Sequence, residues 1–213
     1  MKRLFLWFHL LAVILLIALP AFFVLAATGR FNADPATKWG ADGRSMTLID
    51  RFEYIDGNGR HWVVPGGTVV DGASIPQVFW SLIGGPFNGK YRNASVIHDY
   101  FCEQRRRRWQ DVHHVFYEAM LTSGVESTKA FLMFKAVERF GPRWDDPKIN
   151  PKCLKPDGKF DFSRCTENSG IEAPPAVMAP VRKDDLQALI SEVKGTASAE
   201  DLRALQSIAD KAP

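Results

Sequence analysis

The sequence lacks a strong excess of charge of either sign. Its 27 lysines and arginines nearly balance 24 aspartates and glutamates, which leaves a formal net charge of +3 at pH 7. Binding to a phosphate backbone needs a concentrated positive field, and a nearly neutral chain does not provide one. We therefore expect no nucleic-acid partner.

Cysteine is also scarce, with three residues among 213. Cys153 and Cys165 lie in one segment that contains proline and glycine and has little apolar sequence to order it. In an oxidising compartment, closing so short a loop is worth up to ~3 kcal/mol in the chain-entropy model. We expect a Cys153–Cys165 disulfide with Cys102 left free, and the alternative is three buried or unpaired thiols.

Formal charge is absent from a long N-terminal run, Leu4 to Thr28, which follows Lys2 and Arg3. Such a run can cross a bilayer as a helix, and the two basic residues are expected to stay in the cytoplasm. Residues 1–28 are thus a signal-anchor or a signal peptide. The length favours a retained anchor, whereas Val24-Leu25-Ala26 offers small residues to a signal peptidase. We expect a single-pass protein of the inner membrane whose body faces the periplasm or the outside, or a secreted protein if the segment is cleaved.

The remaining chain divides into three parts by composition. Residues 31–144 are dense in aromatic and branched aliphatic side chains and are long enough for one core. Prolines recur through residues 145–181, which predicts a disulfide-stapled loop and a linker. Residues 182–213 contain two short amphipathic patterns, which predict a helical hairpin that docks on the body or self-associates.

Local patterns predict an α+β fold for residues 31–144. β-forming residues flank the turn Asp56-Gly57-Asn58-Gly59 and indicate a hairpin, with a short third strand at 68–70. Apolar periodicity and stop signals predict helices over 93–103, 109–122 and 128–140, the last capped by Ser127. The expected architecture is a small antiparallel sheet of two to three strands packed with a three-helix subdomain, preceded by the N-terminal transmembrane or signal helix.

Two peptides hold most of the polar residues of interest, Asp71-Gly72-Ala73-Ser74-Ile75-Pro76 and Val96-Ile97-His98-Asp99-Tyr100. Between them lies an aromatic segment, Phe79-Trp80-Ser81-Leu82-Ile83-Gly84. Because of these three motifs, residues 62–141 resemble the bacterial and phage family called domain of unknown function 1353. Further matches to the pattern are Val64-Pro65, Asp111, Phe116 and Ala119-Met120.

The resemblance implies a family without an established activity, so it supplies no mechanism. Relatives often carry threonine and arginine where this chain has Val70 and Gln77, so an anion contact by that arginine is not expected here. Many relatives are single small domains. The N-terminal segment and the C-terminal tail are therefore additions of this protein.

The polar residues allow a catalytic interpretation. His98 is a candidate general base oriented by Asp71 or Asp99, with Ser74 or a metal-bound water as the nucleophile. His98, Asp99 and Asp71, together with the more distant Asp111 or His114, also form an acceptable ligand set for zinc or another divalent metal ion.

The same residues allow a structural interpretation. Asp71 would then cap a turn, Ser74 would cap the following helix, and His98 would be a core histidine bonded to a backbone carbonyl. Cys102 lies four residues after His98, and its apolar surroundings favour a packing role. His113 and His114 are neighbours, so one of the two is expected to face solvent.

Two functions stay open from the sequence. One is a hydrolase of an envelope polymer such as peptidoglycan, with His98 as base and Asp71 and Asp99 as orienting groups or ligands. The other is a non-catalytic envelope binding or assembly module in which the cluster is structural. An open cleft at His98 favours the enzyme, whereas an enclosed imidazole favours the module.

Overall fold

The computed structural model describes residues 29–72, 74–85 and 87–213. The expected signal or anchor segment, residues 1–28, lies outside this range. Within the described residues, no helix combines the length and the apolar character needed to cross a membrane. Anchoring by the N-terminal segment therefore stays a prediction.

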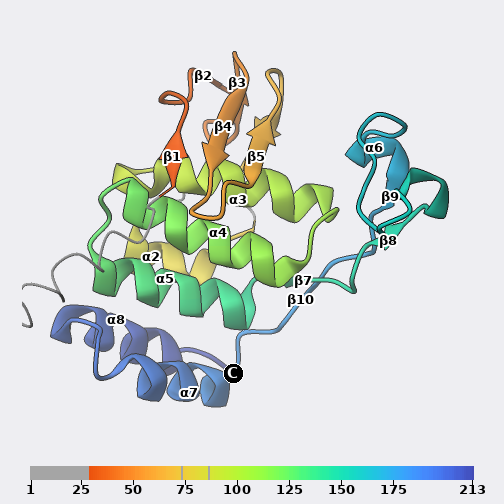
Figure 1. Cartoon of the computed structure of the whole chain (residues 1–213). Helices are drawn as coiled ribbons and strands as arrows, with labels where there is room; N and C mark the ends of the chain where they lie inside the picture. Colours follow the sequence, from red (N-terminus) through yellow and green to blue (C-terminus); the bar gives the residue numbers. More distant parts are fainter. Residues whose placement is uncertain (1–28, 73, 86) are drawn as a thin grey trace, which may run out of the picture.

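The strands of the body form two antiparallel sheets of three strands each. Figure 1 shows them on one side of the helices. The first sheet has the order β1-β4-β5, with β1 at Arg30–Phe31, β4 at Phe52–Ile55 and β5 at His61–Val64. The second has the order β2-β3-β6, with β2 at Thr37–Trp39, β3 at Met46–Leu48 and β6 at Val69–Val70.

The predicted hairpin is β4–β5, and one carboxylate organises its turn. Asp56 Oδ1 accepts hydrogen bonds from the backbone N–H groups of Asn58 and Arg60, each at 2.9 Å. The indole N–H of Trp62 donates to Asp56 Oδ2 at 3.0 Å. The buried carboxylate thus joins the turn to a core side chain, and this arrangement sets the strand register.

The third predicted strand is present, but it belongs to the other sheet. β6 pairs with β3, with Met46 opposite Val70. The turn at residues 65–67 directs the chain away from β5, because Gly67 at φ 81° donates its N–H to Leu48 O. The expectation of one sheet is therefore corrected to two, and strands β1 and β2 are additional to the predicted strands.

Three helices form the layer beneath the sheets, as the apolar periodicity predicted. They are α3 (Arg92–Gln104), α4 (Trp109–Thr122) and α5 (Ser127–Phe140). The cap of α5 differs from the prediction, since Glu126 rather than Ser127 accepts from the backbone N–H groups of Thr128 and Lys129. A longer acceptor one residue earlier reaches the same orphan donors.

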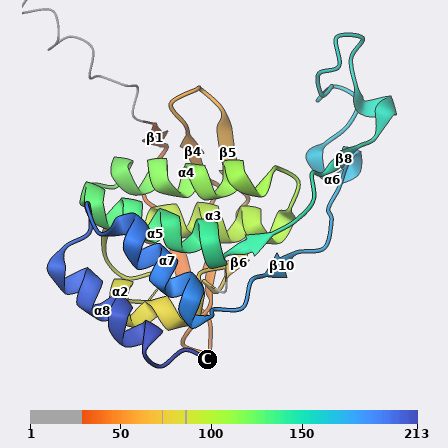
Figure 2. The same ribbon diagram turned by 90° about the horizontal axis from the view of Figure 1, so that it is seen from below.

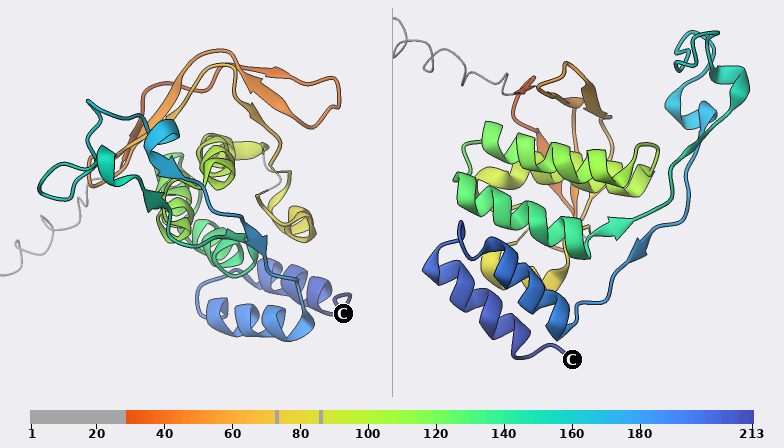
Figure 3. Two further views of the ribbon diagram at one scale, coloured as in Figure 1. Left: turned by 90° about the vertical axis from the view of Figure 1, so that its right-hand side faces the viewer. Right: turned by 60° about the horizontal axis from the view of Figure 1, so that its bottom comes forward.

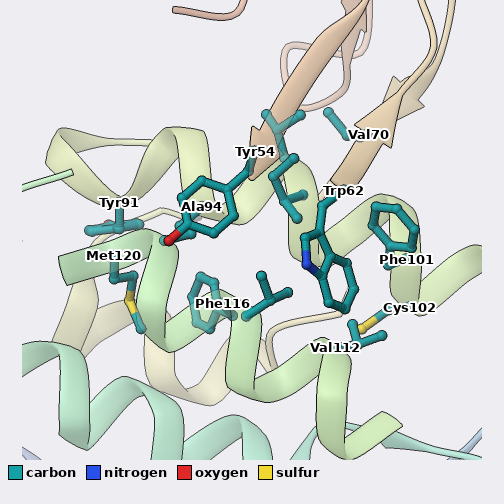
Figure 4. Close-up of a cluster of buried hydrophobic side chains, with 14 of the residues drawn as sticks. Tyr54, Trp62, Val70, Tyr91, Ala94, Phe101, Cys102, Val112, Phe116 and Met120 are labelled. Atoms are coloured by element: carbon teal, nitrogen blue, oxygen red, sulfur yellow. The ribbon is translucent and has the colours of Figure 1, made fainter. Parts of the chain in front are cut away.

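The main core lies between the sheets and helices α3 and α4 (Figure 4). Tyr54 and Trp62 point from the first sheet into this core and are almost completely buried. Trp62 meets Phe101 of α3 edge to face, with ring centroids 4.9 Å apart. This packing fixes α3 against β5 and so positions the polar face of α3.

A second core joins the C-terminal hairpin to the body. The hairpin consists of α7 (Lys183–Val193) and α8 (Ala199–Ala209), and Figure 2 shows it lying along α5 and α2. Its buried leucines pack against Phe79 and Phe140. The sequence left docking on the body and self-association open for this hairpin, and in the described part of the chain it docks on the body. The short elements nearby are η2 (Gln77–Phe79), α2 (Trp80–Ile83) and η3 (Gly89–Tyr91).

Residues 148–172 form a small lobe that stands apart from the helical layers (Figure 3). Cys153 and Cys165 form the predicted disulfide within it, and Cys102 is free and buried. Arg107 connects the lobe to the body through Glu167 at 3.0 Å and through its place over the Trp62 ring. The elements of the lobe and its stem are β7 (Pro142–Arg143), β8 (Lys148–Ile149), η4 (Pro151–Cys153), α6 (Glu167–Gly170), β9 (Ile171–Glu172) and β10 (Val177–Met178).

Candidate functional site

The two polar peptides of the sequence meet through Asp99. Its Oδ2 accepts from the backbone N–H groups of Asp71 and Gly72 at 2.8 and 3.0 Å. Its Oδ1 accepts from the hydroxyl of Ser74 at 2.6 Å and from the Ser74 N–H at 3.3 Å. One carboxylate on α3 thereby closes the loop that follows β6, because both of its oxygens are used by loop donors.

An open cleft of about 660 Å³ lies beside this loop. Asp71, Ser74, Asp99, Cys102 and Glu103 all contribute to its wall. Asp71 also lies 3.9 Å from Arg44, and both side chains are half exposed. The remaining lining comes from the β2–β3 turn, the start of β6 and the stem of the lobe, at Asp42, Ser45, Val69, Pro142, Ala176 and Met178.

His98 lies behind this wall and is completely buried. Its Nε2 is 2.9 Å from Nδ1 of His113, and His113 Nε2 donates to the carbonyl oxygen of Pro142 at 3.1 Å. A neutral His113 that donates through Nε2 must accept through Nδ1, so His98 carries its proton on Nε2. The Nδ1 atom of His98 has no hydrogen-bond partner among the described residues.

Burial holds both histidines neutral. Desolvation, reinforced by the neighbouring His113, places the pKa of His98 well below its usual value. Desolvation also lowers the pKa of His113 to about 4, despite the opposing hydrogen bond to Pro142. Neither imidazole is charged at neutral pH, because an imidazolium here would lose its hydration without gaining a carboxylate partner.

Cys102 lies between the histidines and the cleft. Its Sγ is 3.5 Å from His98 Nε2, and it also contacts the hydroxyl of Ser74. Burial raises the pKa of the Cys102 thiol well above its usual value, and Asp99 raises it further. The thiol is therefore protonated in this structure, and a continuous polar chain runs from Asp99 through Ser74 and Cys102 to the two histidines.

The structure brings together only part of the predicted ligand set. Asp71, Ser74 and Asp99 meet at the cleft, but the oxygens of Asp99 face the loop, and His98 pairs with His113 instead. Asp111 lies elsewhere, 3.3 Å from Arg60, because the start of α4 faces the hairpin. His114 is exposed and next to Glu118.

A different ligand group is present within the described residues. His98, Cys102 and His113 each offer one donor atom, and these three atoms lie within 4.8 Å of one another. The sequence contained a signal for part of it, since His98 and Cys102 are four residues apart on one helix and so share a face. His113 was missed because only the packing of α4 on α3 decides which of two adjacent histidines turns inward.

Comparison with known proteins identifies the region that contains this site. Residues 46–137 match a family model described as a protein of unknown function, DUF1353. These residues form a DUF1353 domain. The DUF1353 domain contains both polar peptides, the free cysteine and His113, whereas the Pro142 carbonyl that binds His113 lies just beyond it.

Two curated proteins from Sinorhizobium fredii are similar to this chain. The uncharacterized protein y4jT is 52% identical over 118 residues, which cover 54% of this chain and 35% of that protein. The uncharacterized protein y4iH is 40% identical over 132 residues, which cover 62% of this chain and 53% of that protein. The chain therefore spans about a third to a half of these relatives. No solved structure matches the chain.

Proposed function

We propose that this chain is a membrane-anchored, envelope-facing binding module whose DUF1353 domain holds its ligand in the cleft beside Asp99. The observation that carries the proposal is the contrast between an enclosed imidazole and an open cleft. His98 is buried and bonded to His113, whereas Glu103 at the cleft wall is exposed and the Asp71 side chain is half exposed. A general base must reach the proton that it removes, and His98 is not placed to do so.

The cleft lining indicates the chemistry of the ligand. Carboxylates from Asp42, Asp71 and Glu103 accept hydrogen bonds from hydroxyl groups and form ion pairs with ammonium groups. The exposed side chains of Val69 and Met178 add an apolar surface to the same wall. A segment of cell-wall polymer that carries hydroxyl and ammonium groups beside methyl groups and apolar C–H faces, as peptidoglycan does, fits this combination.

The disulfide and the N-terminal run support the envelope location. Cys153–Cys165 is a bond that persists in oxidising compartments and is rare in the cytoplasm. The uncharged run from Leu4 to Thr28 has the length of a membrane anchor. A C-terminal alkaline phosphatase fusion tests the location, because this enzyme is active only after export. Activity supports the proposal, and an inactive full-length fusion contradicts it.

Co-sedimentation with purified peptidoglycan tests the binding function. We expect the wild-type protein to sediment with the polymer and the Asp71→Asn/Glu103→Gln double variant to bind at least tenfold more weakly. Asp111→Asn serves as the matched control, since it removes one exposed carboxylate outside the cleft. Equal binding by all three proteins would contradict the assignment of the cleft.

The same samples test the hydrolase alternative, which the presence of Ser74 and Asp99 at the cleft wall favours. A hydrolase would release soluble fragments from the polymer over time. We expect no release by the wild-type protein. Release by the wild-type protein that is lost in an added Ser74→Ala variant would show that the protein is an enzyme rather than a binding module.

A further inference from the structure

Three side chains that commonly bind transition metals converge behind the cleft. His98 and Cys102 come from one face of α3, and His113 comes from the facing side of α4. All three are buried, and their nearest donor atoms lie within 4.8 Å of one another. Two imidazole nitrogens and one sulfur are donors that zinc accepts in tetrahedral sites.

The spacing of the donors is close to that of a coordinated ion. Zinc bond lengths of about 2.05 Å to nitrogen and 2.3 Å to sulfur give tetrahedral separations of ~3.3 Å between nitrogens and ~3.6 Å between nitrogen and sulfur. The observed separations from His98 Nε2 are 2.9 Å to His113 Nδ1 and 3.5 Å to Cys102 Sγ. Binding therefore requires the two imidazoles to move apart by about half an ångström. It also requires Cys102 Sγ and His113 Nδ1, which lie within 4.8 Å of each other, to come to about 3.6 Å.

The surroundings of His113 already hold its ring in the tautomer that a metal ion needs, with the lone pair on Nδ1. Its Nε2 donates to Pro142 O, which leaves the Nδ1 lone pair directed at the cluster. Gly141 makes this contact possible, because a side-chain carbon at that position would lie 3.2 Å from the His113 ring and 2.4 Å from Val137 O. The backbone after α5 therefore provides both the space and the acceptor for the His113–Pro142 hydrogen bond.

We propose that His98, Cys102 and His113 bind a zinc-class divalent ion through Nε2, Sγ and Nδ1. Coordination displaces the Cys102 thiol proton to solvent, and the proton on His98 Nε2 moves to Nδ1. Cys102 also lines the cleft, so the ion would sit at the cleft wall with its fourth position left for water. This site is independent of the polymer binding proposed above.

Cobalt titration of the full-length protein tests the site, because Co²⁺ reports both its ligands and its geometry. We expect one Co²⁺ per chain, a sulfur-to-cobalt charge-transfer band and the intense visible bands of tetrahedral coordination. One equivalent of Zn²⁺ should remove these bands. A folded wild-type protein without the charge-transfer band would overturn the proposal.

Variants assign the ligands. Cys102→Ser should abolish the charge-transfer band, and His113→Gln should weaken Co²⁺ binding at least tenfold. His114→Gln is the matched control, since it changes the adjacent exposed histidine, and it should bind as the wild type does. A charge-transfer band that survives in Cys102→Ser, or a loss of binding in His114→Gln equal to that in His113→Gln, would contradict the assignment.

A labelling measurement keeps the test independent of variant stability. Cys102 is the single cysteine outside the disulfide, so a thiol reagent reports on it alone in the oxidised protein. We expect stoichiometric Zn²⁺ to slow its modification at least tenfold and excess chelator to restore the original rate. Modification that is equally fast with and without Zn²⁺ would contradict coordination by this thiol.

Discussion

At the scale of single residues, two of the buried carboxylates, Asp56 and Asp99, organise backbone segments. Asp99 closes the loop from Asp71 to Ser74, and Asp56 closes the hairpin turn and holds Trp62. In both cases a charged acceptor collects several donors that would otherwise be unpaired. Hydrogen bonds to charged groups are the strong ones, so removal of either charge is expected to be costly.

Asp99→Asn should destabilise the protein. The amide keeps the shape of the side chain, but its NH₂ group is placed against loop donors that need an acceptor. We expect the free energy of unfolding to fall by ~1.5–3 kcal/mol, as measured by urea denaturation. Asp111→Asn, which loses only an exposed ion pair with Arg60, should cost less than ~1 kcal/mol. Equal effects of the two substitutions would argue against the loop-closing role.

Asp56→Asn should show a pH-dependent loss of stability. Burial alone would raise the pKa of Asp56, but the hydrogen bonds from Trp62, Arg60 and Asn58 outweigh it and leave the pKa below 3.8. The ionised carboxylate therefore stabilises the fold fully above pH 3.8, the ordinary pKa of an aspartate. This stabilisation is lost as the pH falls through the lower pKa that Asp56 has in the folded protein. We expect a deficit of ~1–3 kcal/mol at pH 7 that narrows as the pH falls below 3.8. A pH-independent deficit in urea melts would contradict this account.

At the scale of elements, the lobe at residues 148–172 and the helical layers are held together in different ways. The lobe has the β8–β9 ladder, the disulfide and the Arg107–Glu167 ion pair, with few large buried side chains of its own. The helical layers pack around a continuous core. The disulfide therefore stabilises the lobe, whereas apolar burial stabilises the domain.

Replacement of both lobe cysteines, Cys153→Ser/Cys165→Ser, should loosen the lobe alone. Local opening should become easier by up to ~3 kcal/mol, since the loop loses its closure constraint. We expect faster proteolysis between residues 153 and 165, with the urea midpoint of tryptophan fluorescence unchanged. Cys102→Ala is a control that should leave lobe proteolysis as in the wild type. A large shift in the global midpoint would show that the lobe and the domain unfold together.

At the scale of the whole molecule, the C-terminal hairpin completes the body. Leu186, Leu189 and Val193 of α7 are fully buried and share one core with Phe79 and Phe140. An ion pair of 2.7 Å between Lys129 on α5 and Asp201 on α8 lies at the edge of this contact. The hairpin therefore covers an apolar face of α5 that would otherwise be open to water.

Leu189→Ala tests this coupling. The substitution leaves a cavity between α7 and α5, and we expect a loss of ~2–5 kcal/mol in the free energy of unfolding, monitored by the fluorescence of the body tryptophans. Ala188→Ser, at the neighbouring exposed position, should change the stability by less than ~0.5 kcal/mol. An unchanged body transition in Leu189→Ala would show that the hairpin unfolds separately.

The sequence alone determined the α+β class, the β4–β5 hairpin, the extents of α3 to α5 and the disulfide pair. These features depend on neighbours in the chain: turn residues at Asp56 to Gly59, apolar residues at helical spacing, and two cysteines 12 residues apart. The resemblance to the DUF1353 family likewise came from short sequence motifs in a fixed order.

Only the tertiary structure decided how the polar residues are paired. Asp99 binds a loop whose residues lie up to 28 positions away in the sequence. His98 pairs with His113, which lies 15 positions away, and not with an aspartate. Such pairings depend on the rotation of α4 against α3 and on the path of the chain after β6, and the local pattern of each segment is compatible with several of them. The physical reason is that periodicity places a side chain on a face of its helix, while the packing of whole elements decides what that face meets.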